Sequence, residues 1–227
     1  MLEIVIDNDV LLKTARYGVV DALDHIDCAD GCPHESGILG AARFVVGKRL
    51  DRLARRGDIG DHRVSAWREA LPRFIEVEPT DDELRLSAEM EENAIARGLE
   101  LDGGESQLVA IAIMRGEAIV LTGDKRAVVA VEQLMSDVHE LASIAGRVAS
   151  FEQAVRQLAT SLDVLELRAS VCADRAADTA VYVCFKCTDP TIDSTFEPKS
   201  LESYIRDQRA SAPIVMFPGD TLTLASP

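Results

Sequence analysis

Three acidic residues that lie far apart in the chain each border a segment predicted to form regular structure. Asp7 directly follows the apolar run at residues 2–6, Glu105 precedes an apolar stretch, and Asp124 follows the run at residues 118–122. Carboxylate oxygens are the ligands that Mg²⁺ and Mn²⁺ prefer, and a few converging acids are enough to hold either ion. Such an ion promotes phosphodiester cleavage because it polarises a phosphoryl oxygen and lowers the pKa of a bound water. If the fold brings the three acids together, they predict a divalent-metal site.

The elements around these acids alternate between strands and helices. The predicted strands are residues 2–6, 74–77 and 118–122, and the predicted helices are residues 9–25, 38–53, 62–71, 80–97, 106–114 and 124–134. This alternation implies parallel βαβ units, and therefore a three-layer α/β domain with a mainly parallel central sheet. In open sheets of this kind functional groups collect at the carboxyl ends of the strands. Asp7 and Asp124 both fall at such ends.

The pattern changes after residue 148. We expect a first domain of residues 1–148 and a C-terminal extension of residues 149–227. Within the extension the predicted helices are residues 151–162 and 164–172, and the predicted strands are residues 181–183 and 214–217. This mixture indicates an α+β extension.

Three segments of the chain, taken together, resemble the PIN-domain family, which includes the toxin ribonucleases of bacterial toxin–antitoxin pairs. The segments are MLEIVIDNDVLL, LELDGGESQLVAIAIM and AIVLTGDKRAVVAV, and the resemblance covers about residues 1–145. In that family an aspartate ends the first strand, and Asp7 matches it. A GE motif before an apolar helix matches Glu105. A T-x-D motif after the last strand matches Thr122 and Asp124.

The resemblance implies an endoribonuclease that depends on Mg²⁺ or Mn²⁺. Asp7, Glu105 and Asp124 would hold the ion, Thr122 would orient the site by hydrogen bonding, and Asp9 would support it. The implied partners are an RNA substrate, a protein antitoxin or other protein, and a second copy of the chain in a homodimer. Each acid also fits a simpler role as a helix cap, since Asp102 and Glu105 have capping-box spacing. The order of the three acids favours a shared site over three separate caps.

One expected acid is missing. The family usually places a further glutamate on a helix between the first two motifs, but the matching segment SGILGAARFVVGKRL contains no acid. Glu35 lies just before that segment and is the nearest substitute. The departure supports an alternative in which the chain is a catalytically degenerate PIN-like module for binding or assembly.

A cluster of basic residues follows on the same predicted helix. It consists of Lys48, Arg49, Arg52, Arg55 and Arg56. These side chains are suited to sequence-independent contacts with an RNA backbone. The alternative is a solvated helix face that pairs with the many acidic residues of the chain.

The cysteines allow a second, weaker metal hypothesis. Cys28, Cys32 and His34, with His25 nearby, would have to meet Cys184 and Cys187 at a zinc ion. The residues flanking the Cys184-x-x-Cys187 pair resemble strand core and not a zinc ribbon. Free buried thiols are therefore the preferred interpretation.

Composition limits these interpretations. The net charge of −15 is opposite to the basic surface typical of nucleic-acid-binding proteins, so any RNA-binding surface must be local. No apolar run reaches the roughly 18 residues that would span a bilayer. The start of the chain lacks the features of a signal peptide. The five cysteines are an odd number, which fits a reducing compartment better than a disulfide framework. We therefore expect a cytoplasmic protein without membrane contact.

Overall fold

A parallel sheet forms the centre of the molecule. The computed structural model describes residues 2–26, 35–116, 118–193 and 195–222. Within these residues five strands pair in the order β3-β2-β1-β4-β5, and every pair is parallel. The strands are β1 Leu2–Ile6, β2 Glu35–Leu39, β3 Ile75–Val77, β4 Ile119–Thr122 and β5 Val148–Ser150. The predicted α/β fold with a mainly parallel sheet is confirmed.

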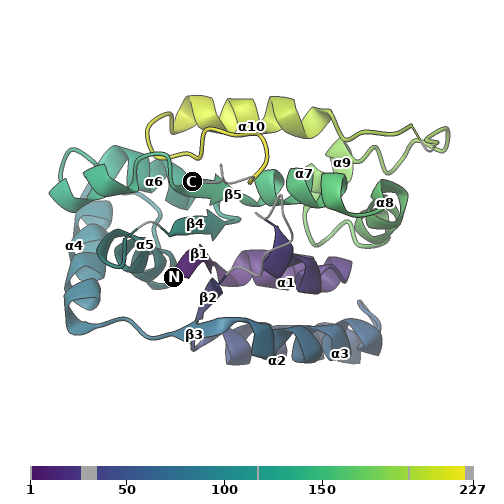
Figure 1. Ribbon diagram of the computed structural model, residues 1–227, viewed down its shortest axis with the longest axis horizontal. Helices are drawn as coiled ribbons and strands as arrows, with labels where there is room; N and C mark the ends of the chain where they lie inside the picture. The colour runs from purple at the N-terminus through teal and green to yellow at the C-terminus, as the bar shows by residue number, and fades with distance from the viewer. Residues whose placement is uncertain (1, 27–34, 117, 194, 223–227) are drawn as a thin grey trace.

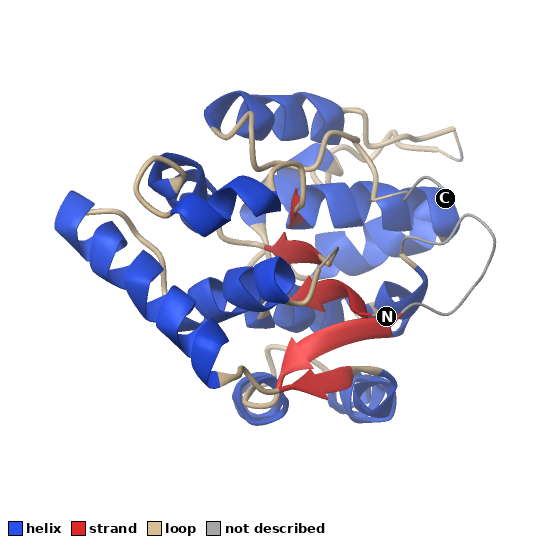
Figure 2. Cartoon of the chain, turned by 60° about the vertical axis from the view of Figure 1, so that its left-hand side comes forward, coloured by secondary structure: helices blue, strands red, loops and turns tan. Residues whose placement is uncertain are grey.

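Helices cover both faces of this sheet (Figures 1 and 2). Side chains alternate across β1, so Ile4 and Ile6 enter one core cluster while Val5 enters the other. The first cluster contains residues of α1, α2, α3, α7 and α8, and the second contains residues of α4, α5 and α6. The helices are α1 Asn8–Tyr17, α2 Ala42–Arg56, α3 Asp61–Ala70, α4 Asp81–Arg97, α5 Gly103–Met114, α6 Lys125–Leu134, α7 Phe151–Ser161, α8 Val164–Ala173, α9 Thr179–Cys184 and α10 Ser200–Ser211, with 3₁₀ turns at Val20–His25, Leu71–Arg73 and His139–Ile144.

The order of the strands reverses between β1 and β4. From β1 the chain builds outward through β2 and β3, and it then returns to the other side of β1 to add β4 and β5. Ile6 pairs with Leu121, and the Asp7 N–H donates to the Leu121 carbonyl at 2.9 Å. In open α/β sheets, ligands bind outside the carboxyl ends of the strands at such a switch point. Asp7 and Asp124 flank it.

Two predicted helices are shorter than expected. The helix predicted at residues 9–25 ends at Tyr17, because Gly18 takes a left-handed conformation with φ of 74°. The helix predicted at residues 38–53 begins only at Ala42, because residues 35–39 form strand β2.

The strands predicted near the C-terminus were wrong. Residues 181–183 lie inside helix α9, whose N-cap is Asp178. Of the segment predicted at 214–217, Met216 forms an isolated bridge to Val148. The sheet instead includes β5, a strand of three residues that the sequence pattern did not indicate.

The C-terminal helices share the core of the preceding segment. Strand β5 begins at the predicted division and pairs with β4, while Phe151 and Leu201 belong to the same core cluster as Ile4. The guanidinium of Arg16 on α1 donates to both carboxylate oxygens of Asp174, at 2.8 and 2.7 Å. A shared hydrophobic core and a salt bridge thus connect residues after 150 to α1.

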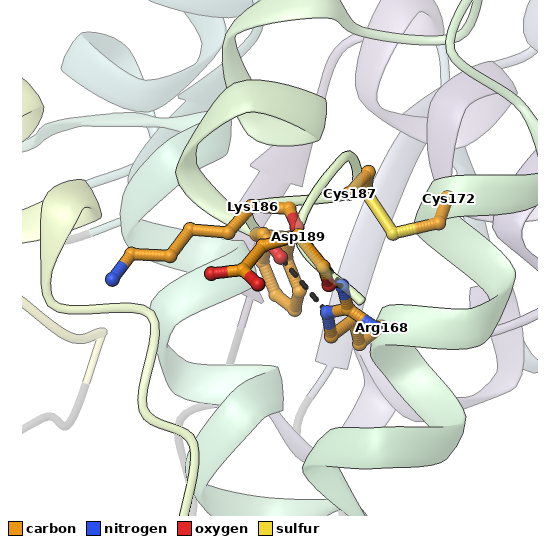
Figure 3. Close-up of a disulfide and its surroundings, with 6 residues drawn as sticks. Arg168, Cys172, Lys186, Cys187 and Asp189 are labelled. Atoms are coloured by element: carbon orange, nitrogen blue, oxygen red, sulfur yellow. Dashed lines mark hydrogen bonds between the residues drawn. A yellow bond between two sulfur atoms is a disulfide. The ribbon is translucent and has the colours of Figure 1, made fainter. Parts of the chain in front are cut away.

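A disulfide bond closes a loop in the C-terminal region (Figure 3). Cys172 at the end of α8 is bonded to Cys187, which follows α9. The guanidinium of Arg168 supports the same loop by donating to the carbonyl oxygens of Phe185, Lys186 and Asp189 at 3.0, 2.9 and 2.9 Å.

The disulfide corrects the expectation for the cysteines. The prediction of a free thiol was wrong for Cys187, which is bonded to Cys172 and is therefore not available to pair with Cys184 at a zinc ion. Cys184 is free and buried, and burial raises the pKa of its thiol. Cys28, Cys32 and His34 lie outside the described residues.

We predict that loss of this disulfide destabilises the chain. Replacing both Cys172 and Cys187 with Ser should lower the free energy of unfolding by ~3 kcal/mol, because the bond closes a loop of 15 residues in the unfolded chain. Urea denaturation checks this value. A reductant should lower the midpoint of the original protein but not that of the double variant, and an unchanged midpoint in the original protein would contradict the prediction.

Candidate functional site

The three predicted acids line one pocket at the carboxyl ends of β1 and β4. The pocket has a volume of about 830 Å³, and its lining includes Asp7, Glu105 and Asp124. Each acid comes from a different part of the sequence: the end of β1, the start of α5 and the loop after β4. The parallel sheet therefore places the three carboxylates around a common space.

Asp7 lines this pocket and is almost fully buried, with 8% of its surface exposed. It is the N-cap of α1, and its Oδ2 accepts the Asp9 N–H at 3.2 Å. Burial raises the pKa of Asp7 to about 6, and the negative charges of Asp9 and Asp102 add to the shift, while backbone hydrogen bonds oppose it. The carboxylate therefore lacks a full counter-charge in its surroundings.

Glu105 has the most strongly raised pKa in the pocket. It forms a reciprocal capping box, in which Asp102 Oδ1 accepts the Glu105 N–H at 3.0 Å and Glu105 Oε2 accepts the Asp102 N–H at 3.1 Å. Burial raises the pKa of Glu105 to about 8, and the charges of Asp102, Asp7 and Asp124 raise it further against the effect of the backbone hydrogen bond. The negative charges of three neighbouring carboxylates thus act on Glu105.

Helix α4 holds α5 in place beside the sheet. The Ser106 hydroxyl, next to Glu105, donates to Glu91 Oε1 at 2.7 Å and lies 2.8 Å from the Ser87 hydroxyl. This buried polar cluster fixes the first turn of α5 against α4. It thereby fixes the position of the Glu105 side chain.

Asp124 is half-buried and carries a partner of opposite charge. The Thr122 hydroxyl accepts the Asp124 N–H at 3.1 Å, which holds the turn between β4 and α6. Asp124 caps α6 by accepting the Arg126 N–H at 2.8 Å, and its Oδ2 is 2.9 Å from the Arg126 guanidinium. Partial burial acts to raise the pKa of Asp124, but the hydrogen bonds and charge of Arg126 outweigh it and hold the pKa below its ordinary value.

The capping interpretation is confirmed, and the shared metal site stays a prediction. Each acid bonds to backbone N–H groups and each also lines the pocket. A carboxylate has two oxygens with several lone pairs, so a cap leaves acceptor capacity for a cation. Among the described residues, no three His, Cys, Asp or Glu side chains form a ready-made metal-binding group.

Asp9 also lines this pocket. Its carboxylate is 2.7 Å from Lys13 Nζ, which is also 2.8 Å from Asp178 before α9. A Cβ atom on Gly123 would lie only 2.3 Å from Asp9 Oδ2, so the loop after β4 passes close to the Asp9 carboxylate. Lys13 thus links Asp9 in the pocket to Asp178 in the C-terminal region.

Glu35 does not lie near the three acids. It is the first residue of β2 and pairs with Leu2, the first residue of β1, so it stands at the opposite end of the sheet from Asp7. The expectation that Glu35 replaces the missing glutamate was wrong, because residues 35–39 form a strand and not the approach to a helix. Val45, Val46 and Arg49 of α2 line the pocket in its place.

The predicted basic residues spread around α2, and all are exposed. Arg49 lines the pocket, whereas Arg55 lines a separate hollow beside Asp51 and donates to the Asp51 carbonyl. Lys48, Arg52 and Arg56 complete the exposed set. Arg49 is therefore the member of this cluster placed to contact a ligand of the carboxylate pocket.

Three charged residues of the pocket were not singled out as site residues from the sequence. Asp102 raises the pKa of both Asp7 and Glu105 by its charge. Lys125 and Arg126 also line the pocket. Their position directly after Asp124 was a usable signal, because the first turn of a helix stays next to its cap.

No model of a known protein family matches this chain. Neither a curated protein nor a solved structure matches it. In the part of the chain that the structure describes, every helix is too short or too polar to cross a lipid bilayer. What the protein does must therefore be inferred from the geometry of its site.

We predict that Glu105→Gln changes stability in a pH-dependent way. The folded-state pKa of Glu105 is raised to about 8 from 4.5. The protonated Glu105 therefore contributes fully to folding stability below pH 4.5, and this contribution is lost as the pH rises through 8. Without metal, the Gln variant should melt at the same temperature as the original protein at pH 4 and at a higher temperature at pH 9.

Glu83 provides the matched control. It is also buried and closes a capping box with Thr80, but the Arg115 guanidinium hydrogen-bonds to it and lowers its pKa. Glu83→Gln should therefore lower the melting temperature at neutral pH. The difference in melting temperature between this variant and the original protein should shrink as the pH falls through the lowered pKa of Glu83. Parallel behaviour of the two variants would contradict the assigned environment of Glu105.

Proposed function

We propose that this chain is a divalent-metal-dependent endoribonuclease of the PIN kind. The observation that carries the proposal is the convergence of Asp7, Glu105 and Asp124 on one pocket at the switch point of a parallel sheet. These are the three acids whose order along the chain resembles the family. Mg²⁺ or Mn²⁺ is the implied cofactor and RNA the implied substrate.

The residues of the pocket fit a hard divalent cation. Asp7 and Glu105 are buried carboxylates with raised pKa values, and the charges of neighbouring acids contribute to both shifts. A cation among them would offset the repulsion and favour their ionised forms. The donors are all carboxylate oxygens, as such ions prefer. Asp7, Glu105 and Asp124 would hold the ion, directly or through water.

The remaining pocket residues have distinct roles in this proposal. Mg²⁺ or Mn²⁺, when bound, supplies Lewis-acid chemistry at the phosphodiester and lowers the pKa of a bound water. Thr122 keeps the loop of Asp124 in place. Arg49, Lys125 and Arg126 give an acidic chain a local group of cations around the pocket, suited to RNA phosphates. A toxin of this kind would have a protein antitoxin as its partner.

Asn substitutions test the proposal. Asp7→Asn and Asp124→Asn should each abolish Mn²⁺-dependent cleavage of single-stranded RNA, because each removes a ligand charge while keeping a side chain that caps helices well. Asp51→Asn is the control, since Asp51 pairs with Arg68 outside the pocket. Cleavage by the two pocket variants at the rate of the control would refute the assignment.

A catalytically degenerate binding or assembly module is the second candidate. Two observations favour it: the Arg126 guanidinium is paired with Asp124, and the side chains that α2 contributes to the pocket are Val45, Val46 and Arg49, with no acid among them. In such a module the pocket would serve to bind a partner and not to bind a metal.

Mn²⁺ titration separates the two candidates. A metal-binding site should raise the melting temperature by ~5–10 °C at an Mn²⁺ concentration near 100 times the Kd. The rise should be larger at pH 8.5 than at pH 6, because binding must displace the proton held by Glu105, whose pKa is about 8. A melting temperature that does not respond to Mn²⁺ at either pH would favour the degenerate module.

A further inference from the structure

The loop closed by the disulfide bond is tied to helix α1 by two ion pairs. Asp174 of this loop is paired with Arg16, with 2.7 Å between Asp174 Oδ1 and the Arg16 guanidinium. Asp178 of the same loop is paired with Lys13, with 2.8 Å between Asp178 Oδ2 and Lys13 Nζ. Both cationic side chains belong to α1, whose N-cap is Asp7. The C-terminal segment is therefore bound by charge to the helix that begins at the carboxylate pocket.

Lys13 is shared between two carboxylates. Its Nζ is 2.7 Å from Asp9 Oδ2 and 2.8 Å from Asp178 Oδ2. The side chains of Lys13 and Asp178 are only 12% and 11% exposed, so water and salt screen this pair less than they screen a surface pair. Burial acts to lower the pKa of Lys13, but the charges of Asp9 and Asp178 outweigh it and raise the pKa above its ordinary value. The ammonium therefore stays charged, and the triad of Asp9, Lys13 and Asp178 carries a net charge of −1.

This triad borders the carboxylate pocket. Asp9 lines the pocket, and a Cβ atom on Gly123 would lie 3.1 Å from Lys13 Nζ, so the ammonium is close to the residue that precedes Asp124. Burial is the main cause of the raised pKa of Asp7, and the negative charge of Asp9 adds to it. The charge of the triad thus acts on a carboxylate that would hold the metal ion.

Asp178 determines the net charge of the triad. Without it, Lys13 and Asp9 would form a neutral pair. With it, one negative charge remains next to the pocket, and a divalent cation is attracted to that charge even when the two are not in contact. A salt bridge that only stabilises the fold would give no such dependence of cation binding on the charge of the triad.

We propose that the C-terminal segment sets the cation affinity of the carboxylate pocket, because Asp178 shares Lys13 with Asp9 and leaves a negative charge next to the pocket. Asp178 and Lys13 are positioning residues that act through Asp9 and do not contact the ion. The inference rests on the proposed function for the presence of a divalent ion, but it does not require RNA cleavage. By linkage, a bound ion in turn favours the docked position of Asp178.

Variants that change the charge of the triad in opposite directions test the proposal. Asp178→Asn keeps an N-cap on α9, because Asn caps helices as well as Asp does, but it leaves Lys13 to neutralise Asp9. Mn²⁺ should then bind more weakly, by about threefold or more. Lys13→Met leaves two carboxylates without their cation, so Mn²⁺ should bind more tightly, by about threefold or more. Electron paramagnetic resonance of free Mn²⁺ measures both affinities without RNA.

The double variant, which combines Lys13→Met with Asp178→Asn, is the most informative. It returns the net charge to −1 through Asp9 alone, so its Mn²⁺ affinity should lie within about twofold of the original. It also removes the buried charge that Lys13→Met alone leaves unpaired, so it keeps the test available where that single variant does not fold. Asp163→Asn is the matched control, because it removes one charge from an exposed N-cap of α8 in the same segment, and its affinity should equal the original.

The outcomes separate this inference from the proposed function. Equal affinities of Asp178→Asn and Asp163→Asn, or a double variant as weak as Asp178→Asn, would overturn the inference and leave the salt bridge a purely structural one. If Asp7→Asn abolishes cleavage while Asp178→Asn binds Mn²⁺ like the original, the nuclease stands and the inference is wrong. If Mn²⁺ affinity follows the charge of the triad but no RNA is cleaved, the inference stands and the nuclease assignment is wrong. An original protein that binds no Mn²⁺ would refute both.

Discussion

The structure depends on the parallel pairing of β1 with β4. This pairing aligns Ile6 with Leu121 and fastens the Asp7 backbone to β4, so that the chain leaves both strands at the same point of the sheet. Both strands are buried by helices on two faces, which explains their continuous apolar sequences. An acidic residue follows each strand, Asp7 directly after β1 and Asp124 one glycine after β4. The hydrophobic effect that buries the strands is therefore also what gathers the carboxylates.

Placing like charges together in a partly buried pocket is unfavourable in free energy, because the charges repel one another and lose contact with water. The fold offsets this free energy in two ways. Helix N-termini at α1, α5 and α6 donate backbone N–H groups to Asp7, Asp102 and Asp124. Arg126 compensates Asp124, whereas Asp7 and Glu105 keep raised pKa values. The uncompensated pair is the part of the pocket best suited to a cation. The carboxylates that cap these helices thus keep oxygen lone pairs that can still accept a ligand.

The sequence was informative where a local pattern decides the structure. The strands around Asp7 and Asp124 were predicted because their apolar runs end abruptly in polar residues. The helix predicted at residues 80–97 is α4, which begins at a capping box of Thr80 and Glu83. Strand β2 was missed because Ile38 and Leu39 run almost directly into the apolar pattern of α2, and Glu35 was misplaced as a result. The disulfide and the pairing of Lys13 with Asp178 depend on contacts between distant segments, which no local pattern encodes.

The central claim is that Asp7, Glu105 and Asp124 bind one divalent ion, and a crystal soaked in Mn²⁺ at pH 8.5 tests it most directly. The anomalous difference map should show a single Mn²⁺ peak within coordination distance of these three carboxylates, with Arg126 moved away from Asp124. A well-ordered pocket without such a peak, in a crystal where Mn²⁺ occupies other carboxylates, would contradict the account.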